Sequence, residues 1–160
     1  MFRNNVSVEA QTRGRLLGRL LIDNYLRQSD ILLGLHQGDI LKSFIFAAIL
    51  SANVKHVTDD VTVSLNYAAL NQRLPFKERK PVSINAISTS LGIPYETTRR
   101  YVLKLMEEGS CVRVSSRGVV IPSEAIDRLF KLDDYKQAAT NLRRLLSGLR
   151  KAGYDLSGDA

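Results

Sequence analysis

Residues 83–121 constrain the fold most, because they combine two short amphipathic helices, a tight turn between them and two short strands. The apolar residues of the first predicted helix recur at steps of three and four: Ile84, Ile87 and Leu91. Ser83 precedes this helix as an N-cap, and Gly92 tolerates the positive φ that ends a helix. Ile93 and Pro94 complete the turn. The pattern therefore predicts two helices that pack against each other across a short connection.

The second predicted helix covers residues 95–108 and has two contrasting faces. Its apolar stripe contains Thr98, Tyr101, Val102, Leu105 and Met106. The opposite face is centred on Glu96 and Arg100 and is flanked by Thr97, Arg99 and Lys104. A helix of this diameter fits the major groove of DNA, where Arg can donate two hydrogen bonds to guanine and Glu can accept one from cytosine. The alternative without a DNA contact is a solvent-exposed ion pair between Glu96 and Arg100.

Two short runs rich in β-branched residues predict a β-hairpin, with strands at residues 111–115 and 119–121. The turn between them contains Ser116, Arg117 and Gly118. A hairpin with a basic tip can contact a phosphate backbone or an adjacent minor groove, with Arg113 and Arg117 supplying the charge. A short strand near residues 80–82 is expected to add a third member.

These elements resemble the helix-turn-helix of bacterial winged-helix regulators, with a pattern similar to the GntR type. The resemblance rests on Leu91, Gly92, Ile93, Thr97, Arg99, Arg100, Leu105, Glu107, Glu108 and Gly109. It implies sequence-specific binding of double-stranded DNA in transcription regulation, through Tyr95, Glu96, Thr97, Arg99, Arg100, Arg117 and Gly118. Pro94, Thr98 and Ser110 depart from the family pattern, and about eighty residues precede the motif, so no effector domain is inferred from the resemblance.

Helices are also predicted on both sides of this segment, at residues 8–35, 39–53, 65–70, 124–132 and 134–151. The helix at 39–53 has almost no polar face, so it is expected to be enclosed, with Asp39 as its cap. Asp133 is expected to cap the last helix, whose apolar seam contains Tyr135, Ala138, Leu142, Leu145 and Leu149. We expect the terminal helices to form a homodimer interface, the alternative being that this seam is only the side of the helix that packs on its own subunit.

The predicted fold is mainly α with a small antiparallel β-hairpin wing. Residues 1–38 form an N-terminal helical extension, residues 39–122 the winged helix-turn-helix DNA-binding domain, and residues 123–160 the C-terminal helices. A chain of 160 residues, 44% of them hydrophobic, can bury one good core, so one compact unit is expected.

Charge and cysteine content narrow the partners and the compartment. Lys and Arg number 23 against 16 Asp and Glu, and the net charge of +7 favours a polyanionic partner without choosing between DNA, RNA and membrane. A lone Cys111 and a polar start of the chain fit a reducing cytoplasm, with association to the nucleoid. The apolar run at residues 44–50 is far shorter than a membrane span, so no membrane contact is expected.

Several side chains suggest chemistry but favour structural roles. Cys111 is a small hydrophobe rather than a redox sensor on a short strand, and His36 and His56 are expected at the surface or in caps, without metal ligands nearby. Paired acids at Asp59, Asp60, Asp133 and Asp134 are expected to cap helices. No catalytic constellation or phosphate loop is visible, so neither an enzyme nor a cofactor is expected.

Three questions stay open: what the winged helix binds, what the basic run before it does, and whether a small effector binds. The winged helix can be a protein-interaction module without specific DNA binding, or it can bind RNA or act in replication. The basic run of Arg73, Lys77, Arg79 and Lys80 is either a solvated loop or an auxiliary phosphate contact. A small effector of unknown chemistry has room among the N-terminal helices.

Overall fold

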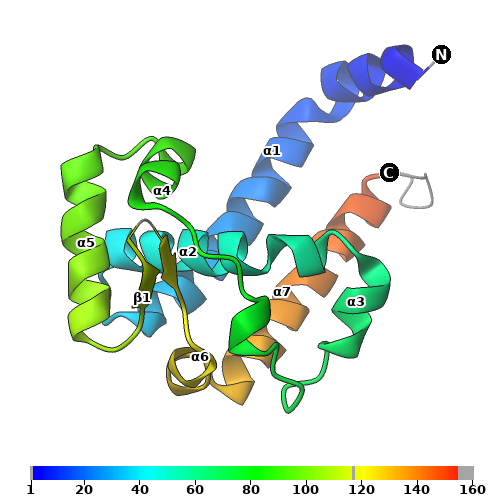
Figure 1. Cartoon of the computed structure of the whole chain (residues 1–160). Helices are drawn as coiled ribbons and strands as arrows, with labels where there is room; N and C mark the ends of the chain where they lie inside the picture. The colour runs from blue at the N-terminus through cyan, green and yellow to red at the C-terminus, as the bar shows by residue number, and fades with distance from the viewer. Residues whose placement is uncertain (1, 117, 155–160) are drawn as a thin grey trace. The chain divides into compact units, whose positions relative to one another are not determined.

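The computed structural model describes residues 2–116 and 118–154, apart from the side chains of residues 2–11 and Ser115. Its elements are α1 (Phe2–Leu35), α2 (Ile40–Thr58), α3 (Val61–Asn66), the 3-10 helix η1 (Phe76–Glu78), α4 (Ile84–Leu91), α5 (Tyr95–Glu107), β1 (Val112–Ser115), β2 (Gly118–Val120), α6 (Ser123–Leu129) and α7 (Leu132–Lys151). The protein is therefore mainly helical with one small antiparallel hairpin, as predicted (Figure 1).

The chain divides into two compact units. Unit 2 is Leu35–Lys131, and unit 1 combines Met1–Gly34 with Leu132–Ala160. This division differs from the expected single unit and from the predicted boundaries at residues 38 and 122. The helix α6 belongs to unit 2 rather than to the C-terminal segment, because Ala125 is fully buried there and the ring of Phe130 lies 6.5 Å from that of Phe46.

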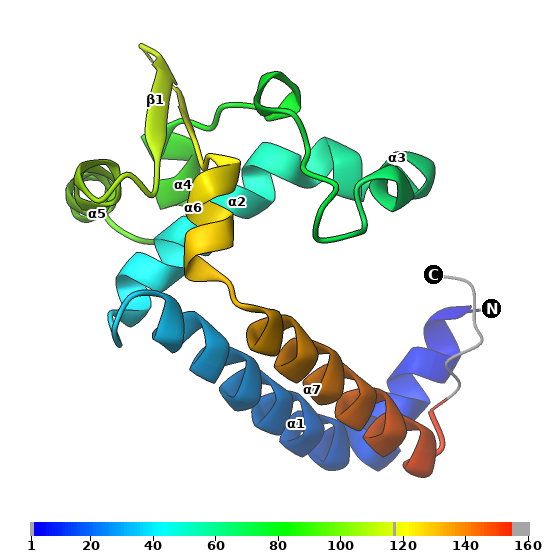
Figure 2. The ribbon, with the colours of Figure 1, turned by 90° about the horizontal axis from the view of Figure 1, so that it is seen from below.

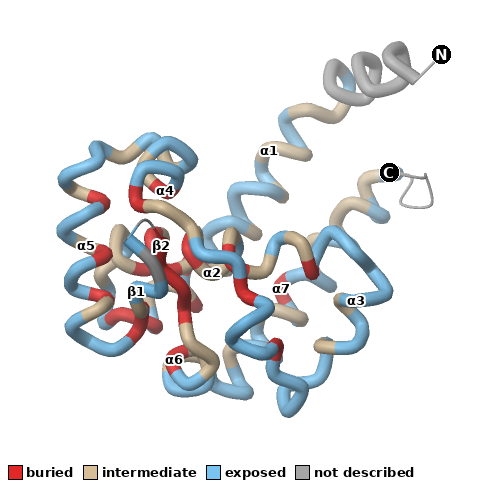
Figure 3. The backbone as a smooth tube through the Cα atoms, in the orientation of Figure 1, coloured by how far each residue is buried: buried red, intermediate tan, exposed pale blue. Residues whose placement is uncertain are grey.

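The core of unit 2 surrounds α2. Ile45, Phe46 and Ile49 of this helix are completely buried, and they meet the apolar faces of α4, α5 and β2. Those faces supply Ile87, Val102, Leu105, Val119 and Val120, together with Ile121 directly after β2, and Figure 3 colours the buried residues red. The prediction that the apolar helix at 39–53 is enclosed is confirmed on this side of the helix. It continues five residues further than expected, to Thr58.

Local signals set several helix ends as predicted. The side chain of Asp39 accepts a hydrogen bond from the Lys42 amide at 3.0 Å, and Ser83 accepts one from the Ala86 amide at 3.1 Å. Gly92 ends α4 with φ +64°, in the left-handed region. The turn that follows allows α5 to begin directly after Pro94 and to pack against α4.

Other helix ends differ from the prediction. The short helix is α3 at Val61–Asn66 rather than 65–70, because Asp60 accepts a hydrogen bond from the Val63 amide and starts the helix earlier. The helix α6 ends at Leu129, three residues before the predicted end. Asp133 is not a cap: α7 begins at Leu132, so Asp133 lies in the first turn and forms an ion pair with Lys136 at 3.0 Å. A negative charge in the first turn still stabilises the helix through its dipole.

The hairpin pairs β1 with β2 in an antiparallel register. Val112 lies opposite Val120 and Arg113 opposite Val119, and a bulge follows Arg113. The third strand predicted at residues 80–82 is a single bridge, in which the backbones of Val82 and Val119 exchange hydrogen bonds of 3.1 and 3.0 Å. This bridge joins the segment before α4 to the hairpin.

One buried polar side chain fixes the elements around β2. The Asn53 amide donates to the carbonyls of Lys80 at 2.7 Å and Val119 at 3.1 Å and accepts from the Ile121 amide at 2.9 Å. Asn53 is fully buried, and all of these bonds cross at least 27 residues of sequence. This role of Asn53 was not predicted, because a single buried amide leaves no local pattern in the sequence.

In unit 1, α1 and α7 run antiparallel, side by side (Figure 2). Asn141 donates to the Arg27 carbonyl at 3.3 Å, and Arg13 donates to the Gly153 carbonyl at 2.6 Å. The helices approach closely at Gly148, where a Cβ would lie 2.8 Å from the Leu20 side chain. The two-helix pair is therefore held by one face of each helix.

Among the described residues, α2 alone is long and apolar enough to cross a bilayer by length and composition, with a mean hydropathy of 1.4. Its central apolar run, residues 44–50, is much shorter than the whole helix, so this length was not predicted. Since α2 is the core helix of unit 2, with Ile45, Phe46 and Ile49 fully buried, the structure is compatible with a soluble protein.

Candidate nucleic-acid interface

Helix α5 presents one polar face to solvent, because the opposite face is fixed in the core. Thr98, Val102 and Leu105 are fully buried, and Tyr101 and Met106 are half-buried, as the apolar stripe predicted. The exposed residues are Tyr95, Glu96, Arg99, Arg100, Leu103, Lys104 and Glu107, with Thr97 half-buried beside them. We call Glu96, Thr97, Arg99, Arg100, Leu103 and Lys104 the α5 face. It contains three cations and one carboxylate, and a second exposed carboxylate, Glu107, follows on the last turn of the helix.

The single carboxylate of the α5 face pairs with Arg99 rather than with Arg100. The Arg99 Nε atom donates to Oε2 of Glu96 at 3.0 Å, and the two side chains are 48% and 74% exposed. An exposed pair of this kind contributes a few tenths of a kcal/mol, roughly, so a phosphate or a base edge can replace it. Both side chains remain accessible to a ligand from outside.

The ring of Tyr101 lies beneath the other two cations. The Arg100 guanidinium lies 5.7 Å and the Lys104 ammonium 5.0 Å from the ring centroid. Cation–π contacts at a surface contribute roughly 0.5–1 kcal/mol and restrict the side chains without neutralising their charge. The sequence analysis gave Tyr101 no role beyond the core, whereas in the structure it positions both cations.

Two depressions in the surface border this region. One, of about 350 Å³, is lined by Glu96, Thr97, Arg99, Arg100 and Leu103. The other, of about 330 Å³, is lined by Ser83, Ile84, Asn85, Tyr95, Arg113 and Ser116. The second brings together the amino end of α4, the start of α5 and the hairpin. The structure thus groups four candidate residues of the helix in the first depression, and Tyr95 with Arg113 in the second, whereas Lys104 lines neither of the two.

Of the three predicted contacts in the hairpin, the structure describes Arg113 and Gly118. Arg113 is exposed, and its Nη1 atom donates weakly to the Ser116 carbonyl at 3.4 Å. Gly118 lies in β2 with its backbone paired opposite Ser115. Arg117, the predicted basic tip, lies outside the described residues.

The four cations of the basic run before α4 have different surroundings in the structure. Arg79 is neither solvated nor a phosphate contact: it is buried and donates to the Ile121 carbonyl at 3.1 Å and to the Ser123 hydroxyl at 3.0 Å. Burial lowers the pKa of Arg79. Arg73 forms an ion pair with Asp127, and Lys77 and Lys80 are exposed.

Two groups that suggested other chemistry are buried. Burial raises the pKa of the Cys111 thiol to about 11, which keeps it protonated and unreactive, as expected of a small hydrophobe. His36 is buried against the Phe46 ring, with centroids 5.3 Å apart, so the expectation of a surface histidine is wrong. The described residues contain no group of three His, Cys, Asp or Glu side chains that could hold a metal ion.

The α5 face, Tyr95 and Arg113 are all in unit 2, and the core that holds α5 also holds the hairpin. Cationic donors on an exposed helix, beside a hairpin with a further cation, can bind a polyanion over several contacts. Compared with protein-family models, with curated proteins and with solved structures, the chain matches none of them.

Proposed function

We propose that unit 2 is a winged helix-turn-helix that binds double-stranded DNA sequence-specifically, and that the protein is a cytoplasmic bacterial transcription regulator without catalytic activity. The observation that supports this most is the α5 face, where Arg99, Arg100 and Lys104 are exposed on one helix whose other side is locked in the core. The resemblance of residues 91–109 to GntR-type regulators supports the same assignment.

In this proposal α5 enters the major groove. Arg99 and Arg100 donate to guanine or to phosphate, Glu96 accepts from cytosine once it leaves Arg99, and Lys104 neutralises a phosphate. Leu103 is an apolar group on the same face, suited to a thymine methyl. The face therefore offers donors, an acceptor and an apolar contact, which base-specific binding requires.

The depression between α4 and the hairpin is the proposed site for a backbone phosphate. Ser83 uses its own oxygen to cap the Ala86 amide, and Arg113 and Tyr95 line the same depression. Helix amino ends favour anions, and Arg113 adds a full charge. A phosphate held here would fix the register of α5 in the groove. Arg117 remains a predicted contact of the wing.

We propose that unit 1 makes the protein a homodimer. On α1, Leu21, Ile22, Tyr25 and Leu26 are exposed at helical spacing, and on α7 a second stripe of Tyr135, Leu142 and Leu146 is exposed. Two helices that expose apolar stripes bury them when a second copy completes a four-helix bundle. Two copies related by a two-fold axis would contact half-sites about one helical turn apart.

The proposal is tested by measuring the affinity for duplex DNA, single-stranded DNA and RNA at one salt concentration. We expect the duplex to bind most tightly and Arg99→Ala with Arg100→Ala to abolish specific binding. The matched control is Arg143→Ala with Arg144→Ala, which removes two adjacent exposed arginines from α7 and the same charge. Equal binding by both double variants, or preference for RNA, would refute the assignment.

Selection of bound fragments from random duplex DNA then tests specificity and symmetry together. A palindromic consensus is expected, with each half bound by one copy of α5. Recovery of random fragments alone would leave only non-specific electrostatic binding and would contradict the regulator assignment.

A further inference from the structure

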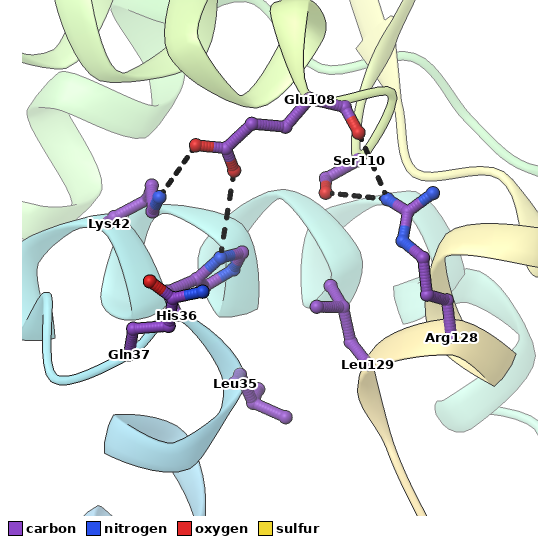
Figure 4. A pocket seen from close by; sticks show the side chains of 8 residues that line it. All are labelled: Leu35, His36, Gln37, Lys42, Glu108, Ser110, Arg128 and Leu129. Carbon is purple, nitrogen blue, oxygen red and sulfur yellow. Dashed lines mark hydrogen bonds and ion pairs between the residues drawn. The ribbon is translucent and has the colours of Figure 1, made fainter.

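A pocket of about 280 Å³ opens at the carboxyl end of α5, within unit 2 (Figure 4). Its polar lining comes from four places in the chain: His36 and Gln37 after α1, Lys42 in α2, Glu108 and Ser110 after α5, and Arg128 in α6. Leu35 and Leu129 add apolar surface. The pocket shares no lining residue with the α5 face, so it is a separate feature of the unit.

The polar groups of the pocket leave one positive charge uncompensated. Lys42 donates to Oε1 of Glu108 at 2.7 Å, and its side chain is only 14% exposed. Arg128 donates through Nη2 to the Glu108 carbonyl at 3.2 Å and to the Ser110 hydroxyl at 2.9 Å. Glu108 is the single carboxylate of the lining, and the lining contains two cations, Lys42 and Arg128. A monoanion would balance the charges.

His36 supplies a buried group without a partner. Its side chain is 2% exposed, and Nε2 has no hydrogen-bond partner among the described residues. Nδ1 lies 4.0 Å from Oε2 of Glu108, which is too long for a hydrogen bond (Figure 4). Burial is also the main cause of a lowered pKa, so the ring favours its neutral form. A buried polar atom without a partner is rare in a protein interior and indicates a missing partner.

We propose that this pocket binds a small organic monocarboxylate, with the carboxylate on Arg128 and Lys42 and the apolar body against Leu35 and Leu129. Both described hydrogen bonds of Arg128 use Nη2, so its remaining N–H groups suit a second acceptor. The volume is at the lower end of small-molecule sites, which limits the ligand to a few carbon atoms or one ring. This inference goes beyond the proposed DNA binding.

The location gives the ligand a route to α5. Glu108 is the C-cap of that helix, and its side chain is held by Lys42 while its carbonyl is held by Arg128. A carboxylate on Lys42 and Arg128 competes for both donors and so changes how the end of α5 is held. If the DNA assignment is also correct, the ligand will change duplex affinity, because binding at two coupled sites is reciprocal.

The test follows the imidazole signals of the full chain by NMR while propionate or benzoate is added, without DNA. The chain has two histidines, and His56 does not line the pocket, so its signal is an internal reference. We expect saturable shifts at His36 with a Kd below about 1 mM, and no shifts with propionamide or benzamide, which have the same shape without the charge.

Variants separate the pocket from general charge effects. Arg128→Gln and Lys42→Gln are each expected to weaken carboxylate binding by roughly tenfold or more, since each removes a charge-assisted hydrogen bond. Lys55→Gln is the matched control, because Lys55 is an exposed cation of the same helix α2. Two pocket variants are used so that a folding defect in one leaves the other informative.

Three outcomes would overturn the proposal. They are the absence of saturable shifts at His36 in the wild-type protein, equal binding of the amides, and binding of inorganic phosphate in place of the carboxylates. None of these measurements involves a duplex, so failure here is distinguishable from failure of the DNA assignment.

Discussion

The two units differ in how completely they bury the apolar side chains of their main helices. In unit 2, Ile45, Phe46 and Ile49 of α2 are completely buried by elements of the same unit. In unit 1, α1 and α7 each bury one face against the other and leave further large apolar side chains exposed, with Ile22 63% and Leu26 60% accessible. A two-helix pair cannot enclose two apolar stripes, whereas helices and a hairpin packed around a central helix, as around α2, enclose its apolar residues. The difference supports the proposal that a second copy covers the exposed stripes of unit 1.

The predicted seam of α7 illustrates the same point. Leu145 and Leu149 are half-buried, whereas Tyr135 and Leu142 of the same predicted seam are exposed. The residues at 138, 141, 145 and 148 form the packed face, and Tyr135, Leu142 and Leu146 form a neighbouring stripe at helical spacing. The single seam of the sequence analysis is therefore two adjacent stripes, of which α1 covers one.

The largest expected effect is on the closed core of unit 2. Asn53→Ala removes three buried hydrogen bonds and leaves the Lys80 carbonyl and the Ile121 amide without this partner, while the Val119 carbonyl keeps the Val82 amide. We expect the free energy of unfolding to fall by roughly 3–5 kcal/mol, the range for broken buried networks. Urea denaturation measures this. A decrease below about 1 kcal/mol would show that Asn53 does not hold the unit together.

The second effect concerns the open face of unit 1. Ile22→Glu places a charge in the exposed stripe and is expected to weaken self-association by roughly a hundredfold, because a dimer would bury that charge. Sedimentation over a range of concentrations measures it. Leu65→Glu is the control, since Leu65 is 67% exposed on α3 in unit 2. If both variants self-associated to the same extent, the proposed dimer interface in unit 1 would be contradicted.

A smaller effect is expected from pH. Burial lowers the pKa of His36 below 6.5 in the folded chain, with Lys42 and Arg128 lowering it further and Glu108 and Asp39 opposing them. The unfolded chain therefore binds more protons below pH 6.5, so stability falls as the pH drops from 6.5 and levels off below the folded pKa. His36→Gln should flatten this part of the curve, as followed by thermal unfolding. An unchanged curve would show that His36 does not titrate between these limits.

The smallest effect is expected at Cys111. Its thiol is buried, with a pKa raised to about 11, so alkylating reagents at neutral pH should not modify it until unit 2 unfolds. Mass spectrometry of the native and urea-unfolded chain measures the modification. Rapid alkylation of the native protein would show that this part of the core opens readily.

Features with local signals were predictable, and features with distant partners were not. Asp39, Ser83 and Gly92 act on residues at most four positions away, so their types alone predicted the helix ends. Arg79 was assigned to a basic loop because its neighbours are basic, but its partners are 42 and 44 residues away. Asn53 and His36 were missed for the same reason.

The candidate site shows the same limit. Periodicity predicted which residues of α5 are exposed, since one face of the helix had to be apolar. It did not predict that Glu96 pairs with Arg99 rather than Arg100, because both spacings permit an ion pair and side-chain geometry decides. Nor did it predict that the Tyr101 ring would lie beneath Arg100 and Lys104.

The central claim, that the α5 face binds a DNA duplex, is tested most directly by the salt dependence of duplex affinity. For Arg99→Gln with Arg100→Gln, we expect affinity to fall by roughly tenfold or more. The slope of log affinity against log salt should become shallower by about one for each phosphate that the variant no longer neutralises. Arg143→Gln with Arg144→Gln should keep the wild-type slope and affinity. If both double variants shift the slope and the affinity equally, net charge alone explains binding and the claim is contradicted.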